Sequence, residues 1–111
     1  MATFIGSGAF NNCTKLMTAN FPAATTIGSN AFAYCSSLRT ISFPTTTVIG
    51  PSAFYNCKSM SSVRFPAVTA IGSSAFYNCV KLSFLYLPGS SVCTLSNSNA
   101  FTSTPFAGYK G

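Results

Sequence analysis

Hydrophobic positions along the chain repeat with a fixed period of 22 residues. Each copy begins with an Ile-Gly pair, at Ile5, Ile27, Ile49 and Ile71, and no residue is inserted or lost between the copies. A fixed period in the twenties is typical of a solenoid, in which each repeat is one turn that buries its apolar face only against its neighbours. The pattern therefore predicts a single α/β solenoid over residues 1–111, with repeats starting near these four positions.

Each repeat is predicted to contain two extended segments. Apolar residues two apart, such as Ala19 and Phe21 or Ile41 and Phe43, indicate a strand with one buried face, and a proline such as Pro22 ends it. Parallel stacking of these strands predicts a one-sided sheet along the solenoid. After each proline, a second short extended piece leads back to the next Ile-Gly pair.

The segment between the Ile-Gly pair and this strand is predicted to form one short helical turn. Its pattern is Ser-x-Ala-Phe-x-x-Cys, and the preceding glycine is expected to take a positive φ. The Phe falls on the buried side, so a stacked aromatic spine is expected from Phe10, Phe32, Phe54 and Phe76. The spacing lengthens after Pro88, and residues 95–106 are predicted to form a degenerate final repeat, because terminal repeats are often atypical.

The charged residues exclude most enzyme classes. The chain has six Lys and Arg side chains but no Asp, Glu or His. General acid–base catalysis near neutral pH normally needs a carboxylate or an imidazole. Calcium and magnesium sites need carboxylate oxygens, and zinc sites need clustered Cys and His. The sequence therefore predicts a non-enzymatic protein with no cofactor and no metal site.

A net charge of +6 favours anionic partners. The cations are spread along the chain, however, and no cluster of Lys and Arg marks a nucleic-acid site. They could also serve only solubility. The N-terminus has no basic segment followed by an apolar run, so no signal peptide is predicted. No apolar run approaches the roughly 18 residues that a membrane-spanning helix needs.

Four cysteines occupy the same place in the repeat and should stack as a ladder: Cys13, Cys35, Cys57 and Cys79. Parallel side chains in a ladder do not supply the roughly 90° torsion of a disulfide, so buried free thiols are expected. Metal binding is not expected, because the chain has no Cys-x-x-Cys pair. Thiolate catalysis is not expected, because no His or Asp is present to activate a thiol. Cys93 lies outside the ladder, and either burial in the last strand or an intermolecular disulfide fits it.

The motif Ile-Gly-x-x-Ala-Phe-x-x-Cys-x-x-Leu, followed by a strand that ends at proline, resembles the BspA-type leucine-rich repeat over roughly residues 4–106. The ending Cys-Thr-Leu-Ser-Asn-Ser-Asn-Ala-Phe is similar to the last repeat of such arrays in gut-bacterial surface proteins and prophage tail-associated proteins. The resemblance implies a leucine-rich repeat fold and an adhesion or recognition role at a cell surface or virion. It implies no catalysis and no fixed set of binding residues.

The outward side chains of the predicted strands form the candidate binding face. Aromatic and Arg residues are over-represented at interface hot spots, and the candidates are Met17, Arg39, Arg64, Phe84 and Tyr86. An ordinary solvated sheet face is the other interpretation. A row of Tyr34, Tyr55 and Tyr77 beside the turns is either structural or able to stack sugars.

Two functions remain open on the sequence alone. The first is a non-enzymatic protein- or glycan-binding adhesion module of a bacterial surface or phage-tail-like protein. The second is a structural solenoid that associates head to tail into fibres, because a non-closing contact between open ends generates filaments.

Overall fold

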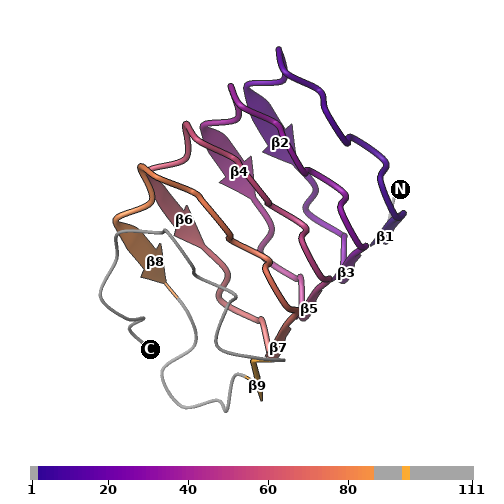
Figure 1. The fold of residues 1–111 in the computed structure, drawn as a ribbon. Helices are drawn as coiled ribbons and strands as arrows, with labels where there is room; N and C mark the ends of the chain where they lie inside the picture. Colours follow the sequence, from indigo (N-terminus) through magenta and orange to yellow (C-terminus); the bar gives the residue numbers. More distant parts are fainter. Residues whose placement is uncertain (1–2, 87–93, 96–111) are drawn as a thin grey trace.

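The computed structural model describes residues 3–86 and 94–95, and these residues form a solenoid of parallel strands (Figure 1). The longest sheet has five strands of two residues each, stacked side by side in the order β1-β3-β5-β7-β9. Its register is one repeat per step, with Ile5 opposite Ile27 and Ile49 opposite Ile71. The strands are β1 (Phe4–Ile5), β3 (Thr26–Ile27), β5 (Val48–Ile49), β7 (Ala70–Ile71) and β9 (Thr94–Leu95).

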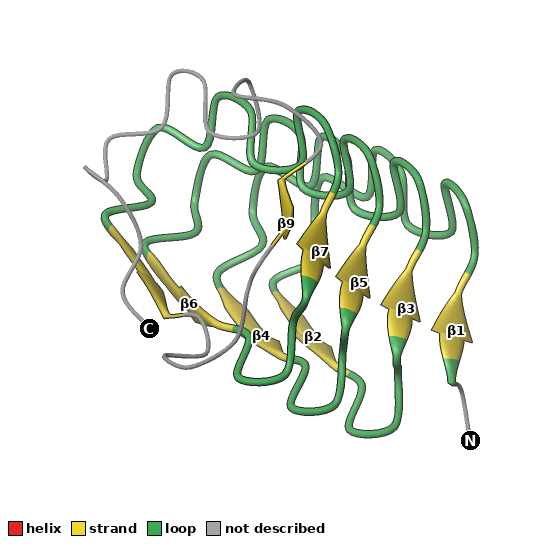
Figure 2. Cartoon of the chain, turned by 90° about the horizontal axis from the view of Figure 1, so that it is seen from below, coloured by secondary structure: helices red, strands yellow, loops and turns green. Residues whose placement is uncertain are grey.

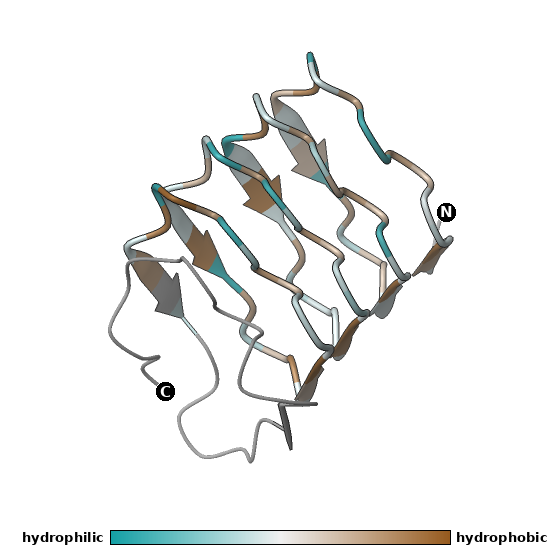
Figure 3. Cartoon of the chain, viewed as in Figure 1, coloured by the Kyte–Doolittle hydropathy of each residue, from teal (hydrophilic) through white to brown (hydrophobic). Residues whose placement is uncertain are grey.

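A second row of three-residue strands runs along another side of the solenoid (Figure 2). It contains β2 (Thr18–Asn20), β4 (Thr40–Ser42), β6 (Ser62–Arg64) and β8 (Phe84–Tyr86). These are the strands predicted from the alternating pattern, and Figure 3 shows the hydrophobic middle residue of β4 and β6 between more hydrophilic neighbours. The prediction of parallel strands is confirmed, with one difference. The row pairs as two separate sheets, β2-β4 and β6-β8, whereas the continuous sheet is the one at the Ile-Gly pairs.

The predicted helical turn is replaced by successive β-turns, and the residues that the structure describes contain no helix. In the first repeat, the Ala9 amide donates to the Gly6 carbonyl at 3.1 Å, a bond that closes a four-residue turn. The amide of the following residue reaches along the solenoid instead, as Phe10 N does to Ala31 O at 2.7 Å. In a helix, these amides would all donate to carbonyl groups of the same segment. The turns keep alternate amides free to tie one repeat to the next.

Left-handed residues occur at two places in each repeat, four residues apart. In the second repeat they are Asn30 with φ 56° and Tyr34 with φ 63°. Asn tolerates this region because its short polar side chain bonds locally, whereas a bulky residue pays about 1–2 kcal/mol there. Tyr34 therefore carries backbone strain that the Asn at the same place in other repeats avoids.

The glycine of the Ile-Gly pair has a different role from the predicted one. Gly28, Gly50 and Gly72 do not have a positive φ. They lie where the backbones of successive repeats meet, and a Cβ on Gly50 would come within 2.8 Å of Gly28 C and Ile27 O. Close approach, not turn geometry, excludes a side chain at this position.

The core is built from two rows of phenylalanine rings. In the first row, ring centroids are 5.2 Å apart from Phe10 to Phe32 and 5.3 Å apart from Phe32 to Phe54, with nearly parallel planes. A second row runs from Phe21 through Phe43 to Phe65, with centroids 5.8 Å apart at each step. Phe32 and Phe54 are fully buried, but Phe10 is only half-buried, because no repeat among the described residues packs against its outer side.

Candidate functional site

The candidate strand face consists of the outward side chains on and beside β2, β4, β6 and β8. Met17 is 59% exposed and Phe84 is 45% exposed, and both arginines are exposed. Tyr86 is half-buried. One-sided burial explains this placement, because alternate residues of a strand point to opposite faces, as in β6, where Val63 is buried between exposed neighbours.

The structure brings three of the five candidates together at one end of the face. Arg64 and Tyr86 are directly opposite each other in the β6–β8 pair. The guanidinium carbon of Arg64 lies 4.7 Å from the centre of the Tyr86 ring, which is a cation–π contact. The rings of Phe84 and Tyr86 are 6.5 Å apart. Arg64, Phe84 and Tyr86 form the β6–β8 cluster.

The other two candidates lie on the first two repeats. The amide of Arg39 donates to the carbonyl of Met17 at 2.9 Å, so these residues are neighbours across the β2–β4 pair. The candidate residues therefore form two groups, and the junction between β4 and β6 separates the strand pairs to which the groups belong.

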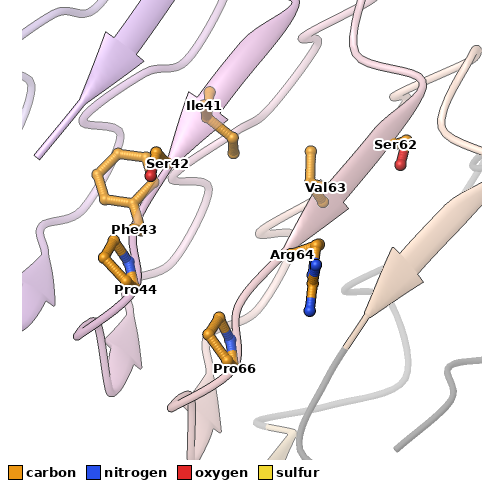
Figure 4. Close-up of a pocket in the computed structure, with 8 residues that line it drawn as sticks. All are labelled: Ile41, Ser42, Phe43, Pro44, Ser62, Val63, Arg64 and Pro66. Atoms are coloured by element: carbon orange, nitrogen blue, oxygen red, sulfur yellow. The ribbon is translucent and has the colours of Figure 1, made fainter. Parts of the chain in front are cut away.

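A groove of about 370 Å³ lies at that junction. Figure 4 shows its walls, which come from two successive repeats. The residues lining it are Ile41, Ser42, Phe43, Pro44, Ser62, Val63, Arg64 and Pro66.

The groove opens where the backbone ladder is interrupted. Phe21 N donates to Ser42 O at 3.1 Å, but the corresponding bond from Phe43 N to Arg64 O is missing among the described residues. Ile41 is half-buried at this opening, whereas the equivalent Val63 is fully buried. The sequence does not predict the groove, since the 22-residue spacing continues through it without a change.

The charged side chains of the candidate strand face are all positive. No acidic side chain exists anywhere in the chain, so Arg39 and Arg64 cannot form an intramolecular ion pair with one. Their positive charge is compensated only by solvent, counter-ions or a partner. An anionic surface that approaches the face therefore meets no side-chain repulsion.

The cysteine ladder lies in the core and not at this face. Cys35, Cys57 and Cys79 are buried and Cys13 is half-buried, and all four are free thiols. The Sγ of Cys57 donates to the carbonyl of Phe32 at 3.1 Å, and Cys79 Sγ donates to Phe54 O at the same distance. Cys93 lies outside the described residues.

Burial keeps these thiols protonated. Desolvation raises the pKa of Cys57 far above its usual value, and the neighbouring thiols Cys79 and Cys35 raise it further. Desolvation likewise raises the pKa of Cys79, to about 12. Because the thiolate is the reactive form, the raised pKa values of Cys57 and Cys79 disfavour nucleophilic chemistry at these thiols.

Two results are expected from the thiols. At pH 8 in native buffer, Cys57 and Cys79 should react with a disulfide reagent at least about a hundredfold more slowly than in urea, whereas Cys13 should react readily. The unfolded thiols ionise from about pH 9.0 while the native ones stay protonated, so stability should fall as pH rises from there to about 12. Site-resolved mass spectrometry measures the labelling rates, and labelling of Cys57 as fast as Cys13 would contradict the first expectation. Urea melts at a series of pH values measure the stability, and a stability that stays constant over this pH range would contradict the second.

Within residues 3–86 and 94–95, no group of three or more Cys, His, Asp or Glu is placed to hold a metal ion. A helix long and apolar enough to cross a membrane is also absent from this part of the chain.

Comparison with known proteins agrees with the fold. The sequence profile of the BspA type leucine rich repeat region (6 copies) matches residues 2–107. A leucine-rich repeat protein from Treponema pallidum has a similar structure, with a TM-score of 0.85 and 28% identity over 96% of this chain and 51% of that one.

A second crystal structure, of a leucine-rich repeat protein from Bacteroides ovatus, gives a TM-score of 0.77 and 29% identity over 84% of this chain and 24% of that one. The chain thus spans about a half and a quarter of the lengths of these two proteins. No curated protein sequence matches it. The repeat motif, the parallel strands and the profile over residues 2–107 agree, and the chain belongs to the BspA-type leucine-rich repeat family.

Proposed function

We propose that this chain is a non-enzymatic adhesion module that binds the anionic surface of a protein partner through its strand face. Leucine-rich repeat proteins generally bind other proteins, and the BspA type is typically associated with bacterial surfaces. The observation that carries the proposal is the β6–β8 cluster, in which an exposed arginine packs on an aromatic ring beside an open groove.

The chemistry of the cluster fits the centre of a binding site. Arg and Tyr are enriched at hot spots, where a cation and an aromatic surface are buried together by the partner. Arg64 is held by Tyr86, so less conformational freedom is lost when it binds. We propose that the chain acts at a cell surface or on the tail of a virion, because the BspA type is typically associated with bacterial surfaces.

Cell binding tests the proposed strand face. Labelled protein is incubated with intact bacterial and epithelial cells, before and after the cells are treated with protease. Arg64→Ala should weaken binding about thirtyfold or more, because a hot-spot truncation costs at least about 2 kcal/mol. Protease treatment of the cells should abolish binding.

Lys15→Ala provides the matched control. It removes one positive charge at an exposed position outside the strand face and should leave binding nearly unchanged. Equal weakening by the two substitutions would show that net charge alone drives retention, and no weakening by Arg64→Ala would refute the proposed face.

Head-to-tail assembly is the second candidate function. The first repeat leaves apolar groups uncovered: Phe4 is 61% exposed, and Phe10 and Phe21 are only half-buried. Among the described strands, β1 pairs on one side only, with β3. A second copy could cover this end. Light scattering over a hundredfold concentration range decides the question, because assembly requires the mass to grow and Phe4→Lys to suppress the growth.

A further inference from the structure

Tyr34 departs from the repeat at a position where its backbone is strained. Asn12, Asn56 and Asn78 hold the same place in the other copies, and all four residues have φ between 58° and 64°. Asparagine is among the residues that best tolerate this conformation, and tyrosine is not. The third and fourth copies carry tyrosine one residue earlier, followed by asparagine, whereas the second copy has alanine followed by Tyr34. Strain of this kind at a single repeat points to a use for the side chain.

The Tyr34 ring lies at the surface and not in the core. Its side chain is 45% exposed, and its centroid is 5.5 Å from that of Tyr55 with the planes tilted by 49°. Tyr55 and Tyr77, by contrast, stack at 4.7 Å with an angle of 6°. Tyr34 is therefore the member of the row whose ring turns away from parallel stacking and remains open to solvent.

Tyr34 forms part of the wall of a pocket of about 240 Å³. Its walls come from three successive repeats, and none of them belongs to the strand face. The lining residues are Asn12, Thr14, Tyr34, Ser36, Asn56 and Lys58. Pockets for drug-sized ligands have volumes of about 300–1,000 Å³. This pocket is smaller and suits a ligand unit of one ring.

The polar groups of the pocket have hydrogen-bonding capacity to spare. Asn56 Oδ1 accepts from Asn78 Nδ2 at 2.6 Å, which leaves the Asn56 amide nitrogen available to donate. In the described part of the chain, the side chains of Asn12 and Lys58 make no hydrogen bond and no ion pair. The pocket thus offers amide donors, hydroxyl groups and one ammonium beside an exposed aromatic ring.

We propose that this pocket binds a saccharide unit that carries a carboxylate or a sulfate. The apolar face of a pyranose ring would stack on Tyr34, as an aromatic ring with a polar edge permits. The amides of Asn12 and Asn56 would bond its hydroxyl groups. Lys58 would pair with its anionic group, and a chain without carboxylate side chains offers that anion no competitor.

The test is an NMR titration of the whole chain with three defined oligosaccharides. 3′-Sialyllactose supplies a carboxylate, lactose 3′-sulfate supplies a sulfate, and lactose supplies neither. At least one anionic sugar should cause saturable shifts of the Asn12 and Asn56 side-chain amides and the Tyr34 ring. Comparison of the two anionic sugars identifies which anion is the ligand. Lactose should bind at least about tenfold more weakly than that sugar.

Tyr34→Asn is the informative variant, because it restores the residue that other repeats carry in the same backbone conformation. It should fold at least as well as the parent chain, as judged by its melting temperature, and lose about tenfold or more in affinity. Tyr34→Phe keeps the ring and should keep most of the binding. Arg64→Ala lies outside the pocket and should bind the sugar as the parent does, so this site can be judged separately from the strand face.

Several results would overturn the proposal. The first three are the absence of saturable shifts with both anionic sugars, equal affinity for lactose, and full binding by a folded Tyr34→Asn variant. Shifts confined to the strand face would also overturn it, since the ligand would then occupy the other surface.

Discussion

Gly50→Ala is expected to lower the free energy of unfolding by about 3 kcal/mol or more. The added Cβ would lie 2.8 Å from Gly28 C, 2.8 Å from Ile27 O and 2.9 Å from Ser29 N. All three are backbone atoms of the preceding repeat, and Gly50 N also donates to Ile27 O at 2.8 Å. The methyl group can be accommodated only if the two repeats move apart, and that movement weakens the bond between them. Urea denaturation followed by circular dichroism measures the loss.

Gly6→Ala is the matched control. The same change at the same place in the first repeat meets no atom within 4 Å, because no repeat precedes it among the described residues. The expected change is within about 0.5 kcal/mol. If both substitutions cost the same, the effect would come from backbone conformational freedom and not from the close approach between repeats.

Phe54→Ala is expected to cost about 3–5 kcal/mol, the usual range for a fully buried phenylalanine. The Phe54 ring lies between Phe32 at 5.3 Å and Phe76 at 5.4 Å, and it also contacts Phe65 at 5.9 Å. Its loss leaves a cavity in the middle repeat, which weakens the interfaces to both neighbours. A thermal melt should show a large drop in the melting temperature.

Phe4→Ala serves as the control for this prediction. Phe4 is 61% exposed, so its truncation should change the free energy of unfolding by no more than about 1 kcal/mol. A small effect of Phe54→Ala, comparable to that of Phe4→Ala, would contradict the role of the aromatic rows in holding successive repeats together.

The candidate face was predictable only in part. Alternation along the strands predicts which side chains point outward, and Arg39, Arg64 and Phe84 are indeed exposed in the structure. The contact of Arg64 with Tyr86 follows from register, because residues 22 apart in successive repeats lie side by side. The groove between β4 and β6 could not be predicted, since it lies where the backbone bond from Phe43 N to Arg64 O is missing, and no residue type encodes that absence.

The pocket around Tyr34 shows the same division. Comparison of the repeats reveals that Tyr34 stands where other copies have asparagine, and this is visible in the sequence. Its positive φ and its exposure are properties of the turns, and these were mispredicted as a helical turn. Local pattern does not distinguish a short helix from a run of β-turns, because both place the Ala and Phe side chains inward.

The sequence by itself determined the period, the parallel stacking and the aromatic core. Each of these depends on burial of a repeated apolar pattern, and with an unbroken 22-residue spacing only one register aligns all the copies. The tertiary structure alone decided how the backbones of successive repeats meet. Whether an amide bonds within its own turn or to the next repeat, and how closely Gly50 approaches Gly28, depends on distances of tenths of an ångström. Such distances arise only when the repeats are packed together, and they shape the groove and the pocket that we propose as binding sites.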